Sequence, residues 1–407
     1  MRIALLAEVT AERVIGGAER VLRHQALGLA SLGHPVEVLA RAPEGTVEDA
    51  VMVGGIRERR YSVNRAHEAA FLWSSVRRSI DAFDSLRQTE PLDAVIIHQA
   101  LAGLGPIVSR RHAASRWVYV CHSLAHEEFE TRRGPAQSTV GHLRRQINCH
   151  ARRWIERAVI MRCDQVVVLS EFMRRRVMAV HGIPADRIVL IPGATDPKTF
   201  TPATNRRGLR ESLHLPVDRT VLLTVRNLVP RMGLENLLDA MAASSMARQC
   251  CTLVIGGEGP LRKTLETQIR KRGLDPIVRL TGFIPEEQLA GHYQAADLVV
   301  MPSLQLEGFG LVTVEAMACG TPVLGTPVGA IPEILNQVDP ILVAQGTDGR
   351  SLAKALNVVL ARIQMPGEYD RLSKKGRSLI EHRYNWNRHC ADLAAVLGGQ
   401  VMLKQAA

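Results

Sequence analysis

The chain has 407 residues, of which 46% are hydrophobic, and it carries a formal net charge of +11. This length exceeds one ordinary domain and fits two domains of about 200 residues each. Its seven cysteines are scattered without a C-x-x-C pair, which argues against a disulfide framework and a structural zinc site. No apolar run is long enough to span a bilayer and no signal peptide is indicated, so we expect a cytoplasmic protein.

Much of the positive charge lies between Arg132 and Arg176, where 11 arginines accompany three acidic residues. The spacing of Arg145, Arg152 and Arg153 predicts that they share one helix face. One interpretation is a solvated helix face, and the other is a surface that meets an anionic acceptor or membrane leaflet at the inner face of the membrane. We expect no nucleic-acid partner, because no known nucleic-acid-binding module is visible.

Short apolar runs alternate with longer amphipathic ones through the first half of the chain. The predicted strands are 3–7, 36–40, 94–98, 117–121, 165–169 and 188–191. The predicted helices are 18–32, 68–87, 104–112, 140–161 and 171–181. This alternation predicts a parallel sheet covered by helices on both faces, with ligands bound beyond the carboxyl ends of the strands.

The second half of the chain repeats the alternation after a polar run, 204–218, that is predicted to be a linker. The predicted strands are 220–225, 252–255, 278–280, 297–300 and 321–324, and the predicted helices are 234–243, 261–272, 285–293 and 311–318. The sequence therefore predicts an α/β protein built from two doubly wound, Rossmann-like domains.

Residues 301–325, MPSLQLEGFGLVTVEAMACGTPVLG, read as a strand end, a glycine loop, a helix and a second strand. Gly308 and Gly310 allow the loop backbone to approach a ligand closely, and the start of the helix suits a phosphate. Glu307 and Glu315 are eight residues apart, which is about two helical turns. Spacing alone fits either an anion site or an ordinary turn with two solvated acids.

Other candidate residues follow predicted strands. Gly16 and Gly17 open the first helix, and His98 and His122 follow later strands of the first half, where each is either functional or a buried structural histidine. In the second half, Arg226 and Arg231 flank a strand-to-helix turn. Two such cations can clamp a diphosphate by charge-assisted hydrogen bonds, although either could be an ordinary surface residue.

The segment around residues 301–325 closely resembles the donor-site motif of glycosyltransferase family 4. The matching features are the strand, Pro-Ser, E-G-F-G, the second Glu and the string A-M-A-C-G-x-P-V. Members of that family are retaining, nucleotide-sugar-dependent enzymes of the GT-B fold. The segment 191–202, the turn 256–260 and the triplet 384–386 also resemble family segments, and the resemblance is strong from about residue 160 onward. It implies an acceptor-binding domain, 1–195, a donor-binding domain, 196–384, a cleft between them, and a C-terminal helix, about 385–407, that packs back on the first domain.

The resemblance also implies roles for single residues. Glu307 would bind hydroxyls of the donor sugar, and Glu315 would accept hydrogen bonds from the ribose. Arg226 and Arg231 would neutralise the diphosphate, although the family has a lysine where this chain has Met232. The implied catalytic residues are Glu307, His122, Arg226 and Arg231. The implied donor-binding residues are Gly16, Gly17, Arg226, Arg231, Gly282, Phe283, Ile284, Glu307, Gly308, Phe309, Gly310, Leu311, Val312 and Glu315. The implied acceptor-binding residues are His98, His122 and Glu127.

The predicted function is a retaining hexosyltransferase that moves a sugar from a nucleotide-diphosphate sugar, with UDP as the expected nucleotide, to an acceptor hydroxyl. No D-x-D pair occurs, so we expect neither a metal nor another cofactor. The acceptor is a lipid-linked or cell-surface polysaccharide intermediate, or a small soluble aglycone of secondary metabolism such as an aminocyclitol.

Three other functions remain as alternatives. A catalytically silent nucleotide-sugar-binding protein would keep the same pocket. A phosphorylase-like enzyme with covalent pyridoxal is disfavoured, because no suitable lysine lies near the predicted site. A glycosidase is disfavoured, because Glu307 and Glu315 bracket a helix start that suits a phosphate instead of flanking one glycosidic bond.

Overall fold

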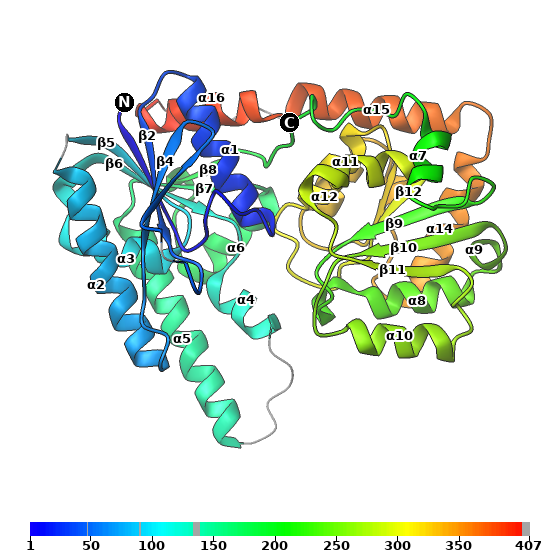
Figure 1. The fold of residues 1–407 in the computed structure, drawn as a ribbon, viewed down its shortest axis with the longest axis horizontal. Coiled ribbons are helices and arrows are strands. Elements are labelled where there is room, and N and C mark those ends of the chain that lie inside the picture. Colours follow the sequence, from blue (N-terminus) through cyan, green and yellow to red (C-terminus); the bar gives the residue numbers. More distant parts are fainter. Residues whose placement is uncertain (47, 89–90, 133–138, 401–407) are drawn as a thin grey trace. The chain divides into compact units, whose positions relative to one another are not determined.

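The computed structural model describes residues 1–46, 48–88, 91–132 and 139–400 of the chain (Figure 1). The chain divides into two compact units, of which unit 1 comprises Met1–Gly193 and Trp386–Ala407, and unit 2 comprises Ala194–Asn385. It crosses between the units at 193–194 and 385–386, whereas the predicted domain limits are 195–196 and 384–385.

Unit 1 is built on a sheet that has eight strands within the described residues, in the order β3-β4-β2-β1-β5-β6-β7-β8. The strands are β1 (Ile3–Ala7), β2 (Val36–Arg41), β3 (Ala50–Val53), β4 (Ile56–Tyr61), β5 (Leu92–Ile97), β6 (Ala114–Cys121), β7 (Gln165–Val168) and β8 (Ile188–Leu190). All neighbours pair in parallel except β3 and β4. The predicted parallel sheet is therefore correct except at this edge, where Gly54 and Gly55, both with positive φ, form a two-residue hairpin turn.

Helices cover both faces of this sheet. They are α1 (Gly17–Ser31), α2 (Glu68–Arg87), α3 (Ala100–Ser109), α4 (Ala125–Arg132), α5 (Thr139–Arg162), α6 (Glu171–His181) and α16 (Trp386–Leu397). Alternate residues of β1 point to opposite faces, so Ile3 and Leu5 pack with α1 and α16, while Ala4 and Leu6 pack with α2, α3, α5 and α6.

Helix α16 belongs to unit 1 although it comes last in the sequence, because it packs along α1. The buried His389 donates from Nδ1 to the carbonyl of Pro192 at 2.7 Å, and its Nε2 accepts from Gln25 of α1 at 2.9 Å. The ring of Trp386 stacks on His24, with centroids 4.7 Å apart. These contacts fix the end of the chain against the first helix of the same unit.

Unit 2, which is described throughout, has a five-stranded parallel sheet in the order β11-β10-β9-β12-β13. The strands are β9 (Thr220–Val225), β10 (Cys251–Gly256), β11 (Val278–Gly282), β12 (Leu298–Met301) and β13 (Val323–Gly325). The helices are α7 (Arg206–Ser212), α8 (Leu234–Ala243), α9 (Ser245–Cys250), α10 (Arg262–Lys271), α11 (Glu286–Ala295), α12 (Leu311–Ala318), α13 (Ile331–Leu335), α14 (Gly349–Ile363) and α15 (Glu368–Arg383).

The predicted linker 204–218 is wrong, because this run contains helix α7. The Asn205 side chain accepts from the Gly208 amide at 2.9 Å and caps the helix. The buried Arg210 donates to Asp297 at 2.5 Å and to the Ala295 carbonyl at 2.8 Å. An arginine anchored in this way makes the run part of unit 2.

The predicted shared helix face is correct for Arg145 and Arg152 but wrong for Arg153. Arg145 donates to the Glu130 carbonyl, and the Arg152 guanidinium lies 4.4 Å from the centre of the Phe129 ring, so both arginines turn toward α4. Arg153 is exposed and donates to the Val180 carbonyl beyond the other side of α5. Arg133 of the predicted cluster lies outside the described residues.

Candidate functional site

The strand order of unit 2 brings two predicted site residues together. Arg226 directly follows β9, and Glu307 lies in the loop that follows β12. Because β9 and β12 are parallel neighbours in the sheet, both residues lie at the same carboxyl edge. Ligands of open α/β sheets bind at this edge.

Arg226 is almost fully buried and its guanidinium is held on three sides. Its Nη2 forms an ion pair with Oε2 of Glu307, and its Nη1 donates to Ser303 Oγ at 2.7 Å and lies 3.5 Å from Met301 Sδ. The Ser303 hydroxyl donates to the same Glu307 oxygen at 2.9 Å. The side chain predicted to bind the diphosphate and the side chain predicted to bind the sugar therefore form one cluster.

The backbone around Glu307 is held from two directions. The Glu307 carbonyl accepts from the Ala330 amide at 3.0 Å, and a Cβ added to Gly329 would lie 2.0 Å from that carbonyl oxygen. Leu306, the preceding residue, has φ of +54°, which is unusual for a residue other than glycine. Such a conformation persists only when its surroundings enforce it, and it is commonly found at binding sites.

The loop that follows Arg226 also packs on this segment. Arg231 donates from Nη1 to the Leu306 carbonyl at 3.3 Å, and its own carbonyl accepts from the Leu304 amide at 2.9 Å. Met232, which stands in the place of the family lysine, is 8% exposed. Gly233 has φ of +70°, and a Cβ there would lie 1.8 Å from the Pro302 oxygen. Arg231 is thus the cation of this turn that contacts the Glu307 loop.

Helix α12 starts at the glycine loop as predicted, with Gly310 in the left-handed conformation at its N-cap. The amides of Leu311 and Val312 fall in its first turn, where backbone N–H groups have no partner within the helix. Phe309 is buried and its ring lies 5.7 Å from that of Tyr384. Glu315 is 1% exposed and accepts from the Tyr293 hydroxyl at 2.9 Å. The Glu315 carboxylate, which is predicted to bind the ribose, is therefore buried.

The loops after β9, β10 and β11 are joined by backbone hydrogen bonds. The Arg226 amide donates to the Gly256 carbonyl at 2.9 Å, and the Gly257 amide donates to the Gly282 carbonyl at 2.7 Å. Beyond Gly282, the Ile284 side chain is buried against Gly256, whereas Phe283 is 56% exposed. Phe283 thus presents an accessible aromatic ring in a segment that is implied to bind the donor.

In unit 1, His98 follows β5 and His122 follows β6, and these strands are neighbours in the sheet. His98 Nδ1 lies 3.0 Å from His122 Nε2, and the rings stack with centroids 5.2 Å apart. His98 is 1% exposed, and its Nε2 has no hydrogen-bond partner among the described residues. The two predicted histidines therefore form a pair.

Burial keeps both imidazoles neutral at neutral pH. It lowers the pKa of His98 well below the usual value, and the neighbouring His122 and His389 add to this effect. Burial also lowers the pKa of His122 to about 4, against a smaller opposing effect of Glu128. A neutral histidine can donate from one ring nitrogen and accept at the other, as a ligand for sugar hydroxyls requires.

The other predicted site residues of unit 1 lie at the starts of helices α1 and α4. Gly16 is the N-cap of α1 and Gly17 is its first residue, and the Gly16 backbone is extended, so its conformation does not itself require glycine. Glu127 forms an ion pair with Arg176 of α6. Its carboxylate is therefore already engaged by a side chain of the same unit.

Sequence reasoning missed a buried network beside His122. Glu156 of α5 is fully buried, accepts from the Tyr119 hydroxyl at 3.0 Å and lies 3.0 Å from His181 Nε2. It also accepts from the Ala125 amide at the start of α4, three residues after His122. This carboxylate therefore fixes the loop that carries His122. The only signal in the sequence is an acid at a core-facing position of a helix.

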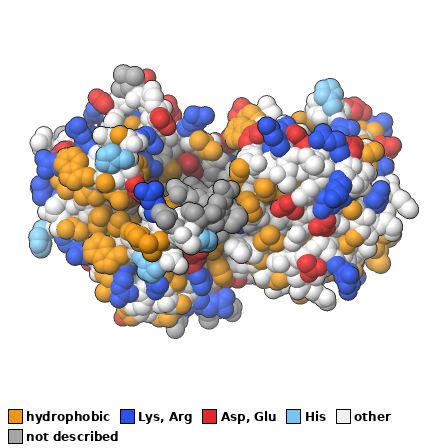
Figure 2. All heavy atoms as spheres, turned by 90° about the horizontal axis from the view of Figure 1, so that it is seen from below, with side chains coloured by type: hydrophobic (Ala, Val, Ile, Leu, Met, Phe, Trp, Pro, Cys, Tyr) orange, Lys and Arg blue, Asp and Glu red, His pale blue; other side chains and the backbone are white. Residues whose placement is uncertain are grey.

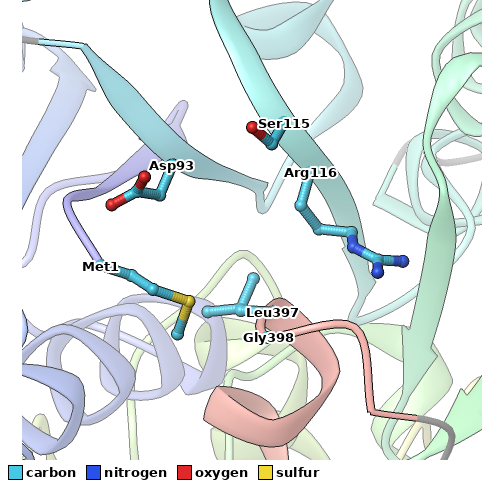
Figure 3. Close-up of a pocket in the computed structure, with 6 residues that line it drawn as sticks. All are labelled: Met1, Asp93, Ser115, Arg116, Leu397 and Gly398. Atoms are coloured by element: carbon cyan, nitrogen blue, oxygen red, sulfur yellow. The ribbon is translucent and has the colours of Figure 1, made fainter.

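A cavity of about 350 Å³ lies at the opposite edge of the unit 1 sheet (Figure 3). It is lined by Met1, Asp93, Ser115, Arg116, Leu397 and Gly398. Asp93, Ser115 and Arg116 stand at the amino ends of β5 and β6. Ligands of such sheets bind at the carboxyl ends, so this cavity is separate from the predicted site.

Family models match both halves of the chain. The model described as "Glycosyltransferase Family 4" matches residues 15–199, and the model described as "Glycosyl transferases group 1" matches residues 205–379. The chain belongs to glycosyltransferase family 4. The predicted resemblance is confirmed, and the matched regions include the histidine pair and the Arg226–Glu307 cluster of this family-4 chain.

Curated relatives of the family-4 chain share about a third of the aligned residues. A GDP-mannose-dependent alpha-(1-6)-phosphatidylinositol monomannoside mannosyltransferase from Mycolicibacterium smegmatis is 30% identical over 249 residues, 60% of this chain and 64% of that protein. A D-inositol 3-phosphate glycosyltransferase from Xylanimonas cellulosilytica is 31% identical over 250 residues, 59% of this chain and 58% of that protein. The chain thus spans about three fifths of the length of these relatives.

Solved structures extend the likeness over the whole family-4 chain. Sucrose-phosphate synthase from Thermosynechococcus elongatus has a TM-score of 0.81 at 24% identity and covers 98% of this chain and 99% of its own. HepE from Anabaena, in complex with UDP, has a TM-score of 0.76 at 18% identity, with coverage of 98% and 100%. These likenesses and the two mostly parallel sheets confirm the predicted GT-B fold.

The described residues of the family-4 chain contain neither a candidate metal site nor a membrane-spanning helix. No group of three or more His, Cys, Asp or Glu side chains among them is placed to hold a metal ion. Among the described helices, none is both long and apolar enough to cross a bilayer.

Proposed function

We propose that this protein is a retaining hexosyltransferase that moves a sugar from a nucleotide-diphosphate sugar to an acceptor hydroxyl. The observation that carries this proposal is the cluster of Arg226, Ser303 and Glu307 at the carboxyl edge of β9 and β12. The cation and the carboxylate of this cluster lie beside the glycine loop that begins α12, and a carboxylate can bind sugar hydroxyls. This arrangement suits a sugar attached to a diphosphate.

In the proposed reaction, Arg226 and Arg231 stabilise the charge that develops on the diphosphate as it leaves. The amides at the start of α12 lie beside Glu307 and add the positive end of the helix dipole to the same task. Glu307 binds hydroxyls of the transferred sugar, and Glu315 binds the ribose. Two arginines and a helix dipole supply the positive charge that a metal often provides, so the proposed transfer is metal-independent.

In unit 1, the proposal assigns His122 to sugar binding, with its neutral imidazole held by His98. Retention would follow from attack on the face that the leaving phosphate vacates. No side chain is assigned as a nucleophile. The acceptor residues in this proposal are His98, His122 and Glu127, the last after release from Arg176.

Two nucleotides are candidates for the donor. UDP is the predicted one and is named in the HepE complex, whereas a mannosyltransferase relative is named as GDP-mannose-dependent. For the acceptor, we propose a lipid-linked or polysaccharide intermediate. The names of the relatives suggest D-inositol 3-phosphate as a soluble probe and phosphatidylinositol monomannoside in vesicles as a lipid probe. A soluble cyclitol acceptor is the alternative.

A thermal-shift panel with UDP, GDP, ADP and their sugar conjugates, without added metal, tests donor binding. A ligand at 100 times its Kd stabilises by about 2.7 kcal/mol, which raises Tm by several degrees. The shift should fall by about half or more in Arg226→Gln and be kept in the exposed Arg270→Gln. Absence of a shift with every nucleotide would overturn the proposal.

Met232 in the lysine place favours one rival, a silent nucleotide-sugar-binding protein. The enzyme and the silent protein differ in turnover. Incubation with the stabilising donor and each acceptor probe, followed by NMR of the anomeric proton, should show a product that keeps the donor's configuration. Donor binding without transfer or donor hydrolysis would favour the silent protein, and an inverted product would remove retention from the proposal.

A further inference from the structure

Helix α5 exposes a stripe of large apolar side chains along its outer face. Leu143, Ile147, Trp154 and Met161 are 59%, 59%, 68% and 45% exposed. Their spacings of four and seven residues correspond to one and two helical turns, so the four side chains lie along one side of the helix. We call this set the α5 stripe.

Arginines flank the α5 stripe on both sides. Arg144 and Arg162 are about 100° from Leu143 on one side of the helix, and Arg153 and Arg157 lie on the other. All four are exposed. The single acid within α5, Glu156, is fully buried and faces the sheet. The outer face of α5 is therefore apolar along its centre and positively charged along its edges.

The α5 stripe is not needed to pack α5 on its own unit. The opposite side of the helix supplies the buried Val159 and Ile160 to the core that also contains residues of β6 and α6. Figure 2 shows hydrophobic side chains gathered on unit 1, with Lys and Arg side chains beside them. Single exposed apolar residues are ordinary, but several aligned on one side of a helix with charged edges are typical of a binding surface.

We propose that the α5 stripe docks on an anionic phospholipid bilayer. Trp154 and the aliphatic side chains of the stripe enter the headgroup region, where amphipathic aromatic rings are favoured. The flanking arginines, Arg144, Arg153, Arg157 and Arg162, meet the lipid phosphates. A helix with an apolar centre and basic edges lies in the plane of such an interface and does not span it.

The charge pattern of the α5 stripe favours an anionic partner. The negatively charged surface of a lipid leaflet is complementary to the arginines on both edges at once. A second copy of the same helix is basic and would repel them. The docking extends the proposed function, since a lipid-linked acceptor is met at a bilayer. Vesicle binding can be measured with no donor present, so it can fail while the transferase proposal stands, and the reverse.

The test is co-sedimentation of the full chain with vesicles of equal phosphatidylglycerol and phosphatidylcholine, compared with phosphatidylcholine alone. We expect binding to the mixed vesicles that falls with added salt and is weak on phosphatidylcholine. Each arginine near an anionic surface is worth roughly fivefold in affinity, so Arg153→Gln with Arg157→Gln should weaken binding about 25-fold. Trp154→Ala should weaken it about tenfold through lost apolar burial.

Matched controls lie in unit 2. Arg270→Gln with Lys271→Gln removes two exposed positive charges from α10, and Val358→Ala removes an exposed apolar side chain from α14. Both should leave vesicle binding unchanged. Every variant should keep its melting temperature and its donor-induced shift, which separates loss of docking from loss of folding.

Three outcomes would overturn the proposal. One is equal binding to both vesicle compositions, and another is binding that survives the α5 substitutions. The third is self-association in the absence of lipid, seen by sedimentation and abolished by Trp154→Ala, which would assign the stripe to a second copy of the chain.

Discussion

The Tyr293 hydroxyl donates to Glu315 at 2.9 Å, and neither side chain is more than 1% exposed. Tyr293 comes from α11 and Glu315 from α12, so the bond joins two helices that pack side by side in unit 2. It also fixes the carboxylate for which we propose a role in ribose binding. Structural and binding roles therefore meet in one side chain.

Tyr293→Phe should destabilise unit 2 by about 1–3 kcal/mol, because it deprives a buried carboxylate of a donor. The change should also raise the Kd for the preferred nucleoside diphosphate several-fold. Urea unfolding and isothermal titration calorimetry measure the two effects. Glu315→Gln keeps an oxygen for the tyrosine and should lose mainly affinity. If Tyr293→Phe changes neither stability nor affinity, the bond does not position the carboxylate.

Substitution of Arg226 and substitution of Glu307 should have different effects on diphosphate binding and on sugar transfer. Arg226→Gln removes charge-assisted hydrogen bonds and should weaken nucleoside diphosphate binding by roughly 10- to 100-fold. Glu307→Gln releases the guanidinium, so binding of the diphosphate without a sugar should be kept or tightened while transfer falls. Isothermal titration calorimetry with the nucleoside diphosphate and a transfer assay distinguish the two variants. Equal losses in both assays for both variants would contradict the assigned roles.

Gly329→Ala should displace the loop that holds Glu307. The added Cβ would lie 2.0 Å from the Glu307 oxygen at a residue with φ of +61°, so steric clash adds to backbone strain. Gly367→Ala is the matched control, because φ there is +77° and nothing lies within 4 Å of the new Cβ. The control should cost about 1 kcal/mol of stability and leave donor binding intact. Gly329→Ala should cost more and also abolish the donor-induced thermal shift.

Acidification should destabilise unit 1 through His389. Burial lowers the pKa of this imidazole to about 4, against a smaller opposing effect of its hydrogen bond to Pro192. The unfolded chain, with an ordinary histidine pKa of about 6.5, takes up the proton first as the pH falls. The stabilisation is therefore complete above pH 6.5 and is lost progressively between about pH 6.5 and 4, by about 3 kcal/mol in total.

Unfolding of wild type and His389→Asn across this pH range checks the prediction. Asparagine can still donate to the Pro192 carbonyl but does not titrate, so the variant should show a shallower fall in stability. His98 and His122 change in the same direction and remain in both proteins. An unchanged slope in the variant would mean that His389 is not buried as a neutral group.

Long periodic segments of the fold could be predicted closely from the sequence. The helices 68–87, 171–181, 234–243 and 311–318 and the strand 220–225 have the predicted limits. The helices 171–181, 234–243 and 311–318 also have a capping serine or a glycine at an end. The β3–β4 hairpin was missed because the charged run from Arg57 to Arg60 hides the alternation, although Gly54-Gly55 is a hairpin signal.

The residues of the candidate site could be predicted from the sequence, but the contacts between them could not. Arg226 and Glu307 each follow a strand, yet their pairing depends on β9 and β12 being neighbours, which is a property of sheet order. Helix α7 was missed because its seven residues are mostly polar, and the packing of Arg210 on Asp297 is a tertiary interaction. The Glu156 network has the same origin, since burial of one acid on a basic helix follows from its neighbours.

The joined loops at the carboxyl edge of unit 2 have a consequence for the thermodynamics of donor capture. Three backbone bonds tie 226–228 to 256–261, and a fourth ties Gly257 to Gly282. A Cβ at Gly257 or Gly259 would meet the backbone of Arg226 or Leu228, respectively. This part of the site is already ordered when the chain has folded, so a nucleotide arriving there loses little affinity to loop ordering. The amides of Arg226, Leu228 and Gly257 should then exchange slowly with solvent deuterium before any ligand is added, and hardly more slowly afterwards.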